Sequence, residues 1–169
     1  DRVSGIVPLA EAPRSRQEAD GLLLAPGFID WQVNGGGDVL FNESPTPEGV
    51  AAIAAAHARF GKTTLLPTLI TDSPDVQREA AAAIAAAVRG VHFEGPHLAP
   101  IRKGAHDADL MRPIEAADRS LLTRGDMGRV VATAAPENAT ASDIRTLARA
   151  GVIVSLGHTD CSYDQAIAC

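Results

Sequence analysis

The sequence predicts an α/β fold in which helices cover a parallel sheet, and three observations lead to this prediction. Short apolar segments alternate along the chain with segments that carry helix start and stop signals. The apolar segments are apolar almost throughout, as is typical of parallel strands buried on both faces. Successive strands lie roughly 20–40 residues apart, which is enough for a right-handed crossover. A doubly wound sheet and a β/α barrel both fit this pattern.

The expected elements follow in order along the chain. The first helix begins with Thr46-Pro47-Glu48, an N-cap, an N1 proline and a first-turn acid, and it stops near Gly61. Ser73-Pro74-Asp75 repeats this start, and Thr140–Asp143 is a capping box. Two further helices are expected from Pro113 to Leu122 and from Ser162 onward. The five expected strands span residues 22–34, 63–71, 90–94, 129–134 and 152–157.

Both ends of the chain differ from this pattern. Residues 1–7 read as a short β-hairpin arm and residues 13–18 as a polar turn, so we expect a small, incomplete β module there. The chain begins at Asp1 instead of Met and stops at Cys169, within a predicted helix. We therefore expect it to be a piece of a longer protein.

Composition excludes several classes of function. The 169 residues are 46% hydrophobic and 21% charged, which argues against intrinsic disorder. The net charge of −6, without any basic run, argues against binding to nucleic acid or an anionic membrane. The longest uncharged apolar run, residues 80–88, is far shorter than the roughly 20 residues that cross a bilayer. The 2 cysteines give no disulfide framework, so we expect a cytoplasmic protein.

Candidate functional residues lie where the predicted strands end, because both possible folds place their chemistry at that edge. Gln32 and Asn34 point to the same side of the first strand and precede three glycines, although a polar strand end with a flexible turn explains them equally well. Glu94 closes an apolar strand, where a carboxylate needs an ion-pair partner or a metal. A salt bridge to an arginine is the alternative for Glu94.

Histidines supply the other candidates. His158 follows the last predicted strand, and with Glu94 on the same rim it forms an incomplete oxygen and nitrogen ligand set for Zn²⁺, Fe²⁺ or Mn²⁺. A lone histidine in that position is more often only hydrogen-bonded. Spacing alone makes His106, in a loop after the third strand, a surface residue. His57 reads as a surface or packing residue of a helix.

Several runs together resemble one known family, the N-acetylglucosamine-6-phosphate deacetylases of the amidohydrolase superfamily. The resemblance covers nearly all of the chain from about residue 20 onward, and Glu94-Gly95-Pro96 with the loop 103–106 is its most specific part. The matching runs are Leu24–Asp30, Gln32–Gly35, Leu66–Thr71, His92–Leu98, Lys103–His106, Ala135–Glu137 and Gly157–Thr159.

The resemblance implies a (β/α)8 barrel of the metal-dependent hydrolase kind, here incomplete with about five strands. Residues 1–24 would belong to a small β-sandwich, and residues 25–169 would form the N-terminal part of the catalytic barrel. Glu94 and His158 would be ligands of one divalent ion, Zn²⁺ in preference to Fe²⁺ or Mn²⁺, because Gln32-Val33-Asn34 replaces the His-x-His of two-metal members. Gln32 and Asn34 would contact the water on that metal, and Ala105 and His106 would contact substrate.

The function implied is deacetylation of N-acetylglucosamine 6-phosphate to glucosamine 6-phosphate and acetate in amino-sugar catabolism, by a full-length protein that is a homodimer. The family's third metal histidine, catalytic aspartate and phosphate-binding residues would lie beyond residue 169. No catalytic residue is therefore assigned within this chain, and we expect little or no activity from it alone. The alternatives are an amidohydrolase acting on a cyclic amide or peptide-like bond, and a non-catalytic fragment that binds a metal or sugar phosphate.

Overall fold

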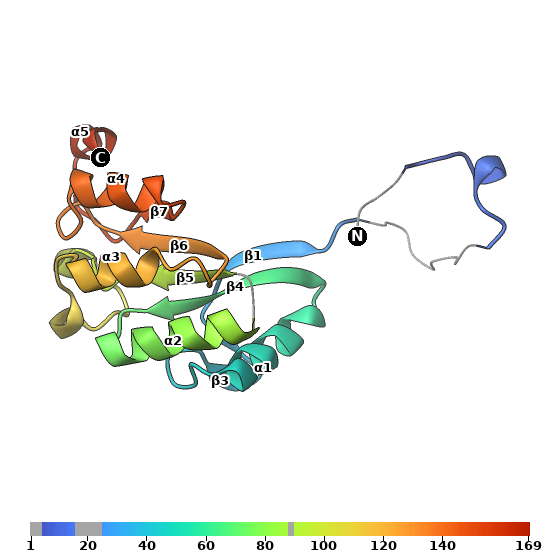
Figure 1. Ribbon diagram of the computed structural model, residues 1–169, viewed down its shortest axis with the longest axis horizontal. Coiled ribbons are helices and arrows are strands. Elements are labelled where there is room, and N and C mark those ends of the chain that lie inside the picture. The colour runs from blue at the N-terminus through green and yellow to red at the C-terminus, as the bar shows by residue number, and fades with distance from the viewer. Residues whose placement is uncertain (1–4, 16–24, 88–89) are drawn as a thin grey trace.

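A five-stranded parallel sheet organises the protein. The computed structural model describes residues 5–15, 25–87 and 90–169. The strands follow one another across the sheet in chain order, β1-β4-β5-β6-β7 (Figure 1). Doubly wound sheets reverse their order at a switch point, whereas barrel strands keep it, so the sheet is an open part of a β/α barrel. The strands are β1 (Phe28–Val33), β4 (Lys62–Ile70), β5 (Gly90–Glu94), β6 (Arg129–Ala134) and β7 (Ile153–Leu156).

Helices connect the strands, and their starts confirm the capping signals. The Thr46 hydroxyl accepts from the Gly49 amide, and capping boxes begin at Thr140 and Ser162. Each side chain satisfies an amide that the first helical turn leaves without a partner. The helices are α1 (Pro47–Ala58), α2 (Pro74–Ala87), α3 (Ala116–Leu122), α4 (Ala141–Arg149) and α5 (Tyr163–Ala168).

Three details of the expected elements were wrong. The first strand, expected from residue 22, begins at Phe28, and the described residues before it, 25–27, are not in a strand. The helix expected from Pro113 begins at Ala116, because the Asp118 carboxylate accepts from the Glu115 amide at 2.8 Å and makes Glu115 the N-cap. The glycines after the first strand are more than a flexible turn. Gly35–Gly36 (β2) pairs with Val39–Leu40 (β3) in a small antiparallel hairpin.

The core lies between the sheet and the helices. Val91 and Phe93 of β5 are 0% and 2% exposed and belong to the same buried cluster as Ile53 of α1 and Leu147 of α4. Because side chains alternate along a strand, the other residues of β5 point into the barrel. Packing of Val91 and Phe93 against the helices therefore directs His92 and Glu94 toward the functional side of the sheet.

The N-terminal module predicted over residues 1–24 is only partly described. Residues 5–15 contain a 3₁₀ turn, Leu9–Glu11, and no strand. The rest of the predicted hairpin and turn, residues 1–4 and 16–24, lies outside the described residues. Assignment of this segment to a β-sandwich stays a prediction. In the described part of the chain, no helix combines the length and apolarity needed to cross a membrane.

Candidate metal centre

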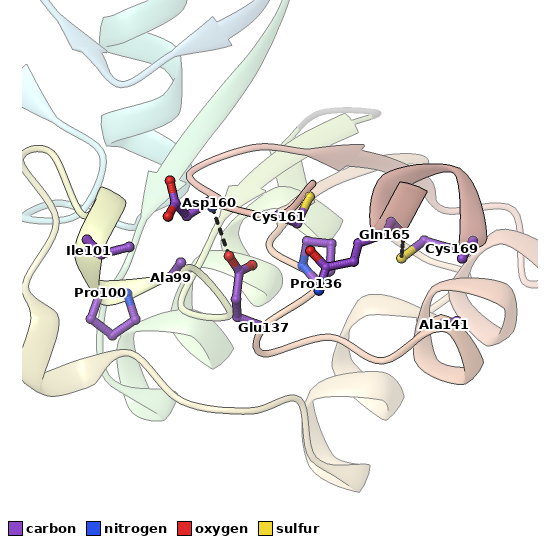
Figure 2. A pocket seen from close by; sticks show the side chains of 11 residues that line it. Ala99, Pro100, Ile101, Pro136, Glu137, Ala141, Asp160, Cys161, Gln165 and Cys169 are labelled. Atoms are coloured by element: carbon purple, nitrogen blue, oxygen red, sulfur yellow. Dashed lines mark hydrogen bonds between the residues drawn. The ribbon is translucent and has the colours of Figure 1, made fainter. Parts of the chain in front are cut away.

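The loops at the carboxyl ends of the strands form both a cavity and a cluster of titratable side chains. The cavity measures about 640 Å³ and lies between the loops that follow β5, β6 and β7, where Pro100, Glu137 and Asp160 line it (Figure 2). None of the predicted metal ligands lines this cavity. The cluster of Glu94, His106 and His158 therefore lies outside this cavity, at the barrel side of the same edge of the sheet.

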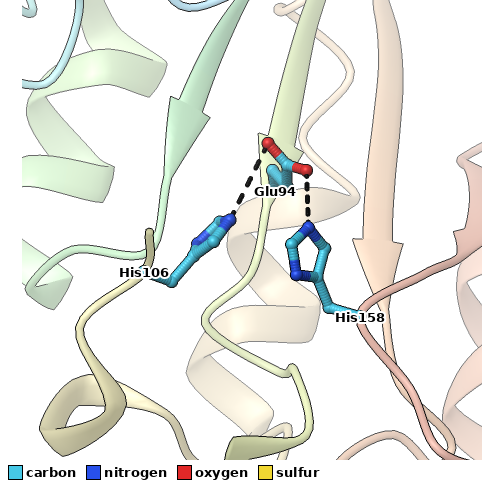
Figure 3. Close-up of side chains that lie close together, drawn as sticks. All are labelled: Glu94, His106 and His158. Atoms are coloured by element: carbon cyan, nitrogen blue, oxygen red, sulfur yellow. Dashed lines mark hydrogen bonds and ion pairs between the residues drawn. The ribbon is translucent and has the colours of Figure 1, made fainter. Parts of the chain in front are cut away.

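Glu94 is the centre of the cluster (Figure 3). It is the last residue of β5, and it is buried. Its Oε1 lies 3.1 Å from His158 Nε2, and its Oε2 lies 3.9 Å from His106 Nε2. One ligand atom from each of these three residues lies within 4.8 Å of the others. The structure thus brings together Glu94 and His158, the pair that the sequence predicted, and adds His106.

The orientation of His158 leaves a lone pair facing Glu94. Its Nδ1 lies 2.8 Å from the Arg102 carbonyl oxygen, which can only accept, so Nδ1 carries a proton. In a neutral ring, the unprotonated Nε2 then faces the carboxylate Oε1, and two acceptors meet at 3.1 Å. A cation between them, or a second proton on the ring, removes this repulsion. Ligand atoms on one tetrahedral zinc lie about 3.3 Å apart at bond lengths of about 2.0–2.2 Å, so the spacing fits a metal.

His106 has the opposite tautomer. The Thr71 amide donates to its Nδ1 at 3.2 Å, which places the proton of the neutral ring on Nε2, the nitrogen nearest Glu94. Burial lowers the pKa of His106, against the opposing effect of the Glu94 charge, so the ring is neutral near pH 7. The surface location expected from spacing was wrong, because His106 is only 5% exposed. Its neighbour Ala105 is exposed.

Thr71 is a site residue that sequence reasoning did not single out. It directly follows β4, and its hydroxyl lies 2.8 Å from the same His106 Nδ1. Gly95 makes this approach possible. A Cβ at Gly95 would collide with the Thr71 hydroxyl, and the φ of +88° at Gly95 favours glycine. One signal in the sequence could have pointed to Thr71. It stands just after β4, and the Gly-Pro turn stands just after Glu94 at the end of the neighbouring strand.

A bulge in β1 positions Gln32 beside Glu94. Asp30 pairs with Leu65 and Val33 with Pro67, so β1 uses one residue more than β4 over this stretch. Gln32 Nε2 donates to Glu94 Oε2 at 3.1 Å. Asn34 is half-buried, and in the described part of the chain its side chain makes no hydrogen bond. The structure therefore joins Gln32 to the cluster without Asn34, and contact of either with a metal-bound water stays a prediction.

Two other histidines have structural partners. His92 lies two residues before Glu94 in β5, on the same face of the strand. Its ring nitrogens contact the hydroxyls of Thr68 at 3.3 Å and Thr133 at 2.8 Å. Burial lowers the pKa of His92, and the Glu94 charge acts in the opposite direction. His57 Nε2 lies 2.9 Å from the Gly35 carbonyl oxygen, as a packing role predicts. Both nitrogens of His92 are engaged, so it is not a ligand candidate.

Comparison with known proteins agrees with this geometry. The sequence pattern of the amidohydrolase family matches residues 23–159. The chain belongs to the amidohydrolase family. This amidohydrolase is 42% identical over 158 residues to the N-acetylgalactosamine-6-phosphate deacetylase of Shewanella sp. (strain ANA-3), a match that covers 89% of the chain and 40% of that protein. It is 38% identical to the human N-acetylglucosamine-6-phosphate deacetylase, covering 85% of the chain and 39% of the relative.

Solved structures show the same arrangement. The crystal structure of N-acetylglucosamine-6-phosphate deacetylase from Pasteurella multocida matches 99% of the amidohydrolase chain and 46% of its own, with a TM-score of 0.91 at 33% identity. The enzyme from Mycobacterium smegmatis gives a TM-score of 0.77 at 35% identity, over 85% of this chain and 43% of that one. The amidohydrolase chain thus spans less than half the length of these relatives, and its fold matches the corresponding part of theirs.

Proposed function

We propose that the intact protein is a metal-dependent deacetylase that hydrolyses N-acetylglucosamine 6-phosphate to glucosamine 6-phosphate and acetate. The meeting of His158 Nε2 and Glu94 Oε1 at 3.1 Å carries this proposal, because a cation would turn two opposed acceptors into two ligands. The names of the relatives support the substrate class. In the reaction, water adds to the acetyl carbon, the carbon–nitrogen bond breaks, and acetate and a free amine leave.

The different tautomers of His106 and His158 indicate different roles for the residues of the cluster. Glu94 and His158 would hold one divalent cation, Zn²⁺ in preference to Fe²⁺ or Mn²⁺, because a carboxylate oxygen and an imidazole nitrogen are suitable ligands for these ions. When bound, such an ion supplies Lewis-acid chemistry for amide hydrolysis. His106 instead offers an N–H, since Thr71 engages its Nδ1, so we assign His106 to donate to an oxygen of the substrate. Ala105, exposed beside it, would contact the sugar phosphate through its backbone.

Other roles follow from the same cluster. Gln32 would orient Glu94, because its amide engages Oε2 and leaves Oε1 facing His158. The aspartate that returns a proton to the sugar amine would lie outside residues 1–169. The proposed ligand is thus a small amino-sugar phosphate. We propose a homodimer for the intact protein. We propose a cytoplasmic location because the 2 cysteines give no disulfide framework.

Acetate release by the intact protein tests the proposal. We expect turnover of N-acetylglucosamine 6-phosphate when Zn²⁺ is supplied, with loss of both turnover and the bound ion in Glu94→Ala. N-acetylgalactosamine 6-phosphate should be assayed in parallel, since one relative is named for it. Glu115→Ala, which removes the carboxylate at the N-cap of α3, is the matched control, because in the described structure that carboxylate makes no hydrogen bond or ion pair with Glu94, His106 or His158.

Three outcomes would contradict the proposal. Ring opening of a cyclic amide without acetate release would favour another amidohydrolase activity. Metal binding that Glu94→Ala abolishes, without turnover of either sugar phosphate, would favour a non-catalytic binding protein. A protein that binds no metal, with a protonated His158 paired to Glu94, would make the contact a structural ion pair.

A further inference from the structure

We propose that Glu137 is a positioning residue for His158: its carboxylate fastens the two residues that follow His158 and so holds the imidazole in place facing Glu94. The inference rests on the proposed function for its effect on metal binding. Glu137 lies in the loop after β6 and touches neither Glu94 nor the His158 ring through any hydrogen bond in the described chain. Its action on the site is through Thr159 and Asp160.

The backbone at His158 needs such support. His158 has a φ of +51°, in the left-handed region that a non-glycine residue rarely adopts. A conformation of this kind persists only where neighbouring contacts hold it. Upstream, the Gly157 amide donates to the Ala134 carbonyl at 3.2 Å, and the His158 carbonyl itself accepts from the Ala99 amide at 2.9 Å.

Glu137 supplies the support on the downstream side. Its Oε2 accepts from the Thr159 hydroxyl at 2.7 Å. Its Oε1 accepts from the Asp160 amide at 2.8 Å, the bond drawn in Figure 2. The Thr159 hydroxyl oxygen in turn accepts from the Cys161 amide at 3.0 Å. One carboxylate thereby fixes a main-chain group and a side chain on the two residues after His158.

The same fastening reaches the imidazole ring. Arg102 accepts from His158 Nδ1 through its carbonyl oxygen, and its Nε donates to Asp160 Oδ1 at 3.0 Å. Asp160 is therefore held by Glu137 through its amide and holds Arg102 through its carboxylate. Loss of Glu137 would loosen the backbone of His158 and the acceptor of its ring proton together, although Glu137 itself is exposed and contributes little to core packing.

The test compares Glu137→Ala, Glu137→Gln and a control, Asp143→Ala, in the intact protein. Asp143 performs the same chemistry elsewhere, because it accepts from the Thr140 hydroxyl at 2.6 Å and from the Thr140 amide at 3.1 Å. Two quantities are measured: the tautomer of His158 in the metal-free protein, by ¹⁵N NMR of the ring nitrogens at a pH high enough for the ring to be neutral, and the dissociation constant for Zn²⁺, by competition with a chelator.

We expect Glu137→Ala to replace the single Nδ1–H tautomer of His158 by an average of the two and to weaken Zn²⁺ binding about 10–100-fold. Glu137→Gln should recover part of both effects, since its amide can accept from Asp160 and donate to the Thr159 oxygen. Asp143→Ala should lower the unfolding temperature while the His158 tautomer stays fixed and Zn²⁺ affinity changes less than about threefold.

An unchanged His158 tautomer in Glu137→Ala would overturn the inference, as would equal changes in Glu137→Ala and Asp143→Ala. If Glu137→Ala does not fold, an unchanged tautomer in Glu137→Gln and Thr159→Val would overturn it as well. A wild-type protein that binds no Zn²⁺ would refute the proposed function instead. The NMR comparison would still decide the role of Glu137, because it is made without metal.

Discussion

The central and outer strands of the sheet hold their functional residues by different means. All five residues of β5 are buried, and five of the six in β6 are, whereas β1 buries only Val33 and β7 buries none of its residues. Glu94 comes from a central strand, fixed by packing on both faces. Gln32 and His158 come from the two outer strands, where side-chain hydrogen bonds replace the missing packing.

This difference shows how one rim can combine rigid and adjustable parts. Thr68 secures β1 by accepting from the Val33 amide at 3.0 Å, and Glu137 and Arg102 secure the chain after β7. A buried hydrogen bond depends on one or two atoms, whereas packing depends on many small contacts. Single substitutions should therefore affect the centre through stability and the edges through local geometry.

The largest effect is expected for Phe93→Ala on β5. Removal of a side chain that is 2% exposed should lower the free energy of unfolding by about 3–5 kcal/mol. Phe28→Ala on β1, where the ring is 69% exposed, should lower it by less than about 1 kcal/mol. Denaturant unfolding of the 169-residue chain measures both. Equal losses would show that β1 is covered in solution and would remove the contrast between centre and edge.

A smaller effect is expected for Thr68→Val, which tests the polar attachment of β1. Valine has the shape of threonine but would leave the buried Val33 amide and His92 Nδ1 without their shared oxygen. The free energy of unfolding should fall by about 1–3 kcal/mol, and the Val33 amide should exchange faster with solvent. Thr64→Val, at an exposed position of the same strand, is the control. Slow exchange at Val33 in Thr68→Val would mean that packing suffices at this edge.

Gln32→Ala should weaken Zn²⁺ binding about 10-fold, or about 1.4 kcal/mol, because Glu94 Oε2 would lose its donor. Chelator competition on the intact protein provides the measurement. Asn34→Ala should leave the dissociation constant unchanged, since the described structure gives that side chain no hydrogen bond. The reverse result, with Asn34 the sensitive position, would exclude Gln32 as the residue that orients Glu94.

The smallest effect concerns pH. Burial lowers the pKa of His97, in the loop after β5, although the Arg112 carbonyl and the Asp118 charge act in the opposite direction. Because the unfolded chain takes up this proton first, His97 contributes its stability above about pH 6.5, and the contribution is lost as the pH falls through the lower folded-state pKa. His97→Gln should reduce the slope of stability against pH by at most about 1.4 kcal/mol per pH unit below about pH 6.5, with no change in slope above pH 7. Identical slopes across the acidic range would contradict the burial effect.

Local chemistry in the sequence predicted much of the fold and the principal pair of the site. The caps at Thr46 and Thr140 begin helices as expected, a helix follows Ser162, and the apolar strands pair in parallel. Glu94 and His158 could be paired because Glu94 ends one strand of the sheet and His158 closely follows another. The site of His106 depended on the fold of a loop, and spacing says little about where a loop returns.

The bulge in β1 was equally hidden. At its end the Val33 amide donates to the Thr68 hydroxyl, 35 positions further along the chain, and local propensity does not reveal such a contact. The β2–β3 hairpin is short, and its first strand consists of two glycines, a residue that is depleted in strands. The missed features are therefore those that depend on contacts between distant side chains and main-chain groups.

Main-chain atoms decide where the protons of both site histidines reside. The amide of Thr71 fixes one ring, and the carbonyl of Arg102 fixes the other. Every amino acid except proline carries a main-chain amide, so position 71 can vary through evolution or mutagenesis without reversing the His106 imidazole. Position 102 is more constrained, because the Arg102 side chain also binds Asp160. The path of the backbone thus sets which ring nitrogen of each histidine carries the proton. This arrangement should tolerate substitutions at neighbouring positions better than substitutions of the histidines themselves.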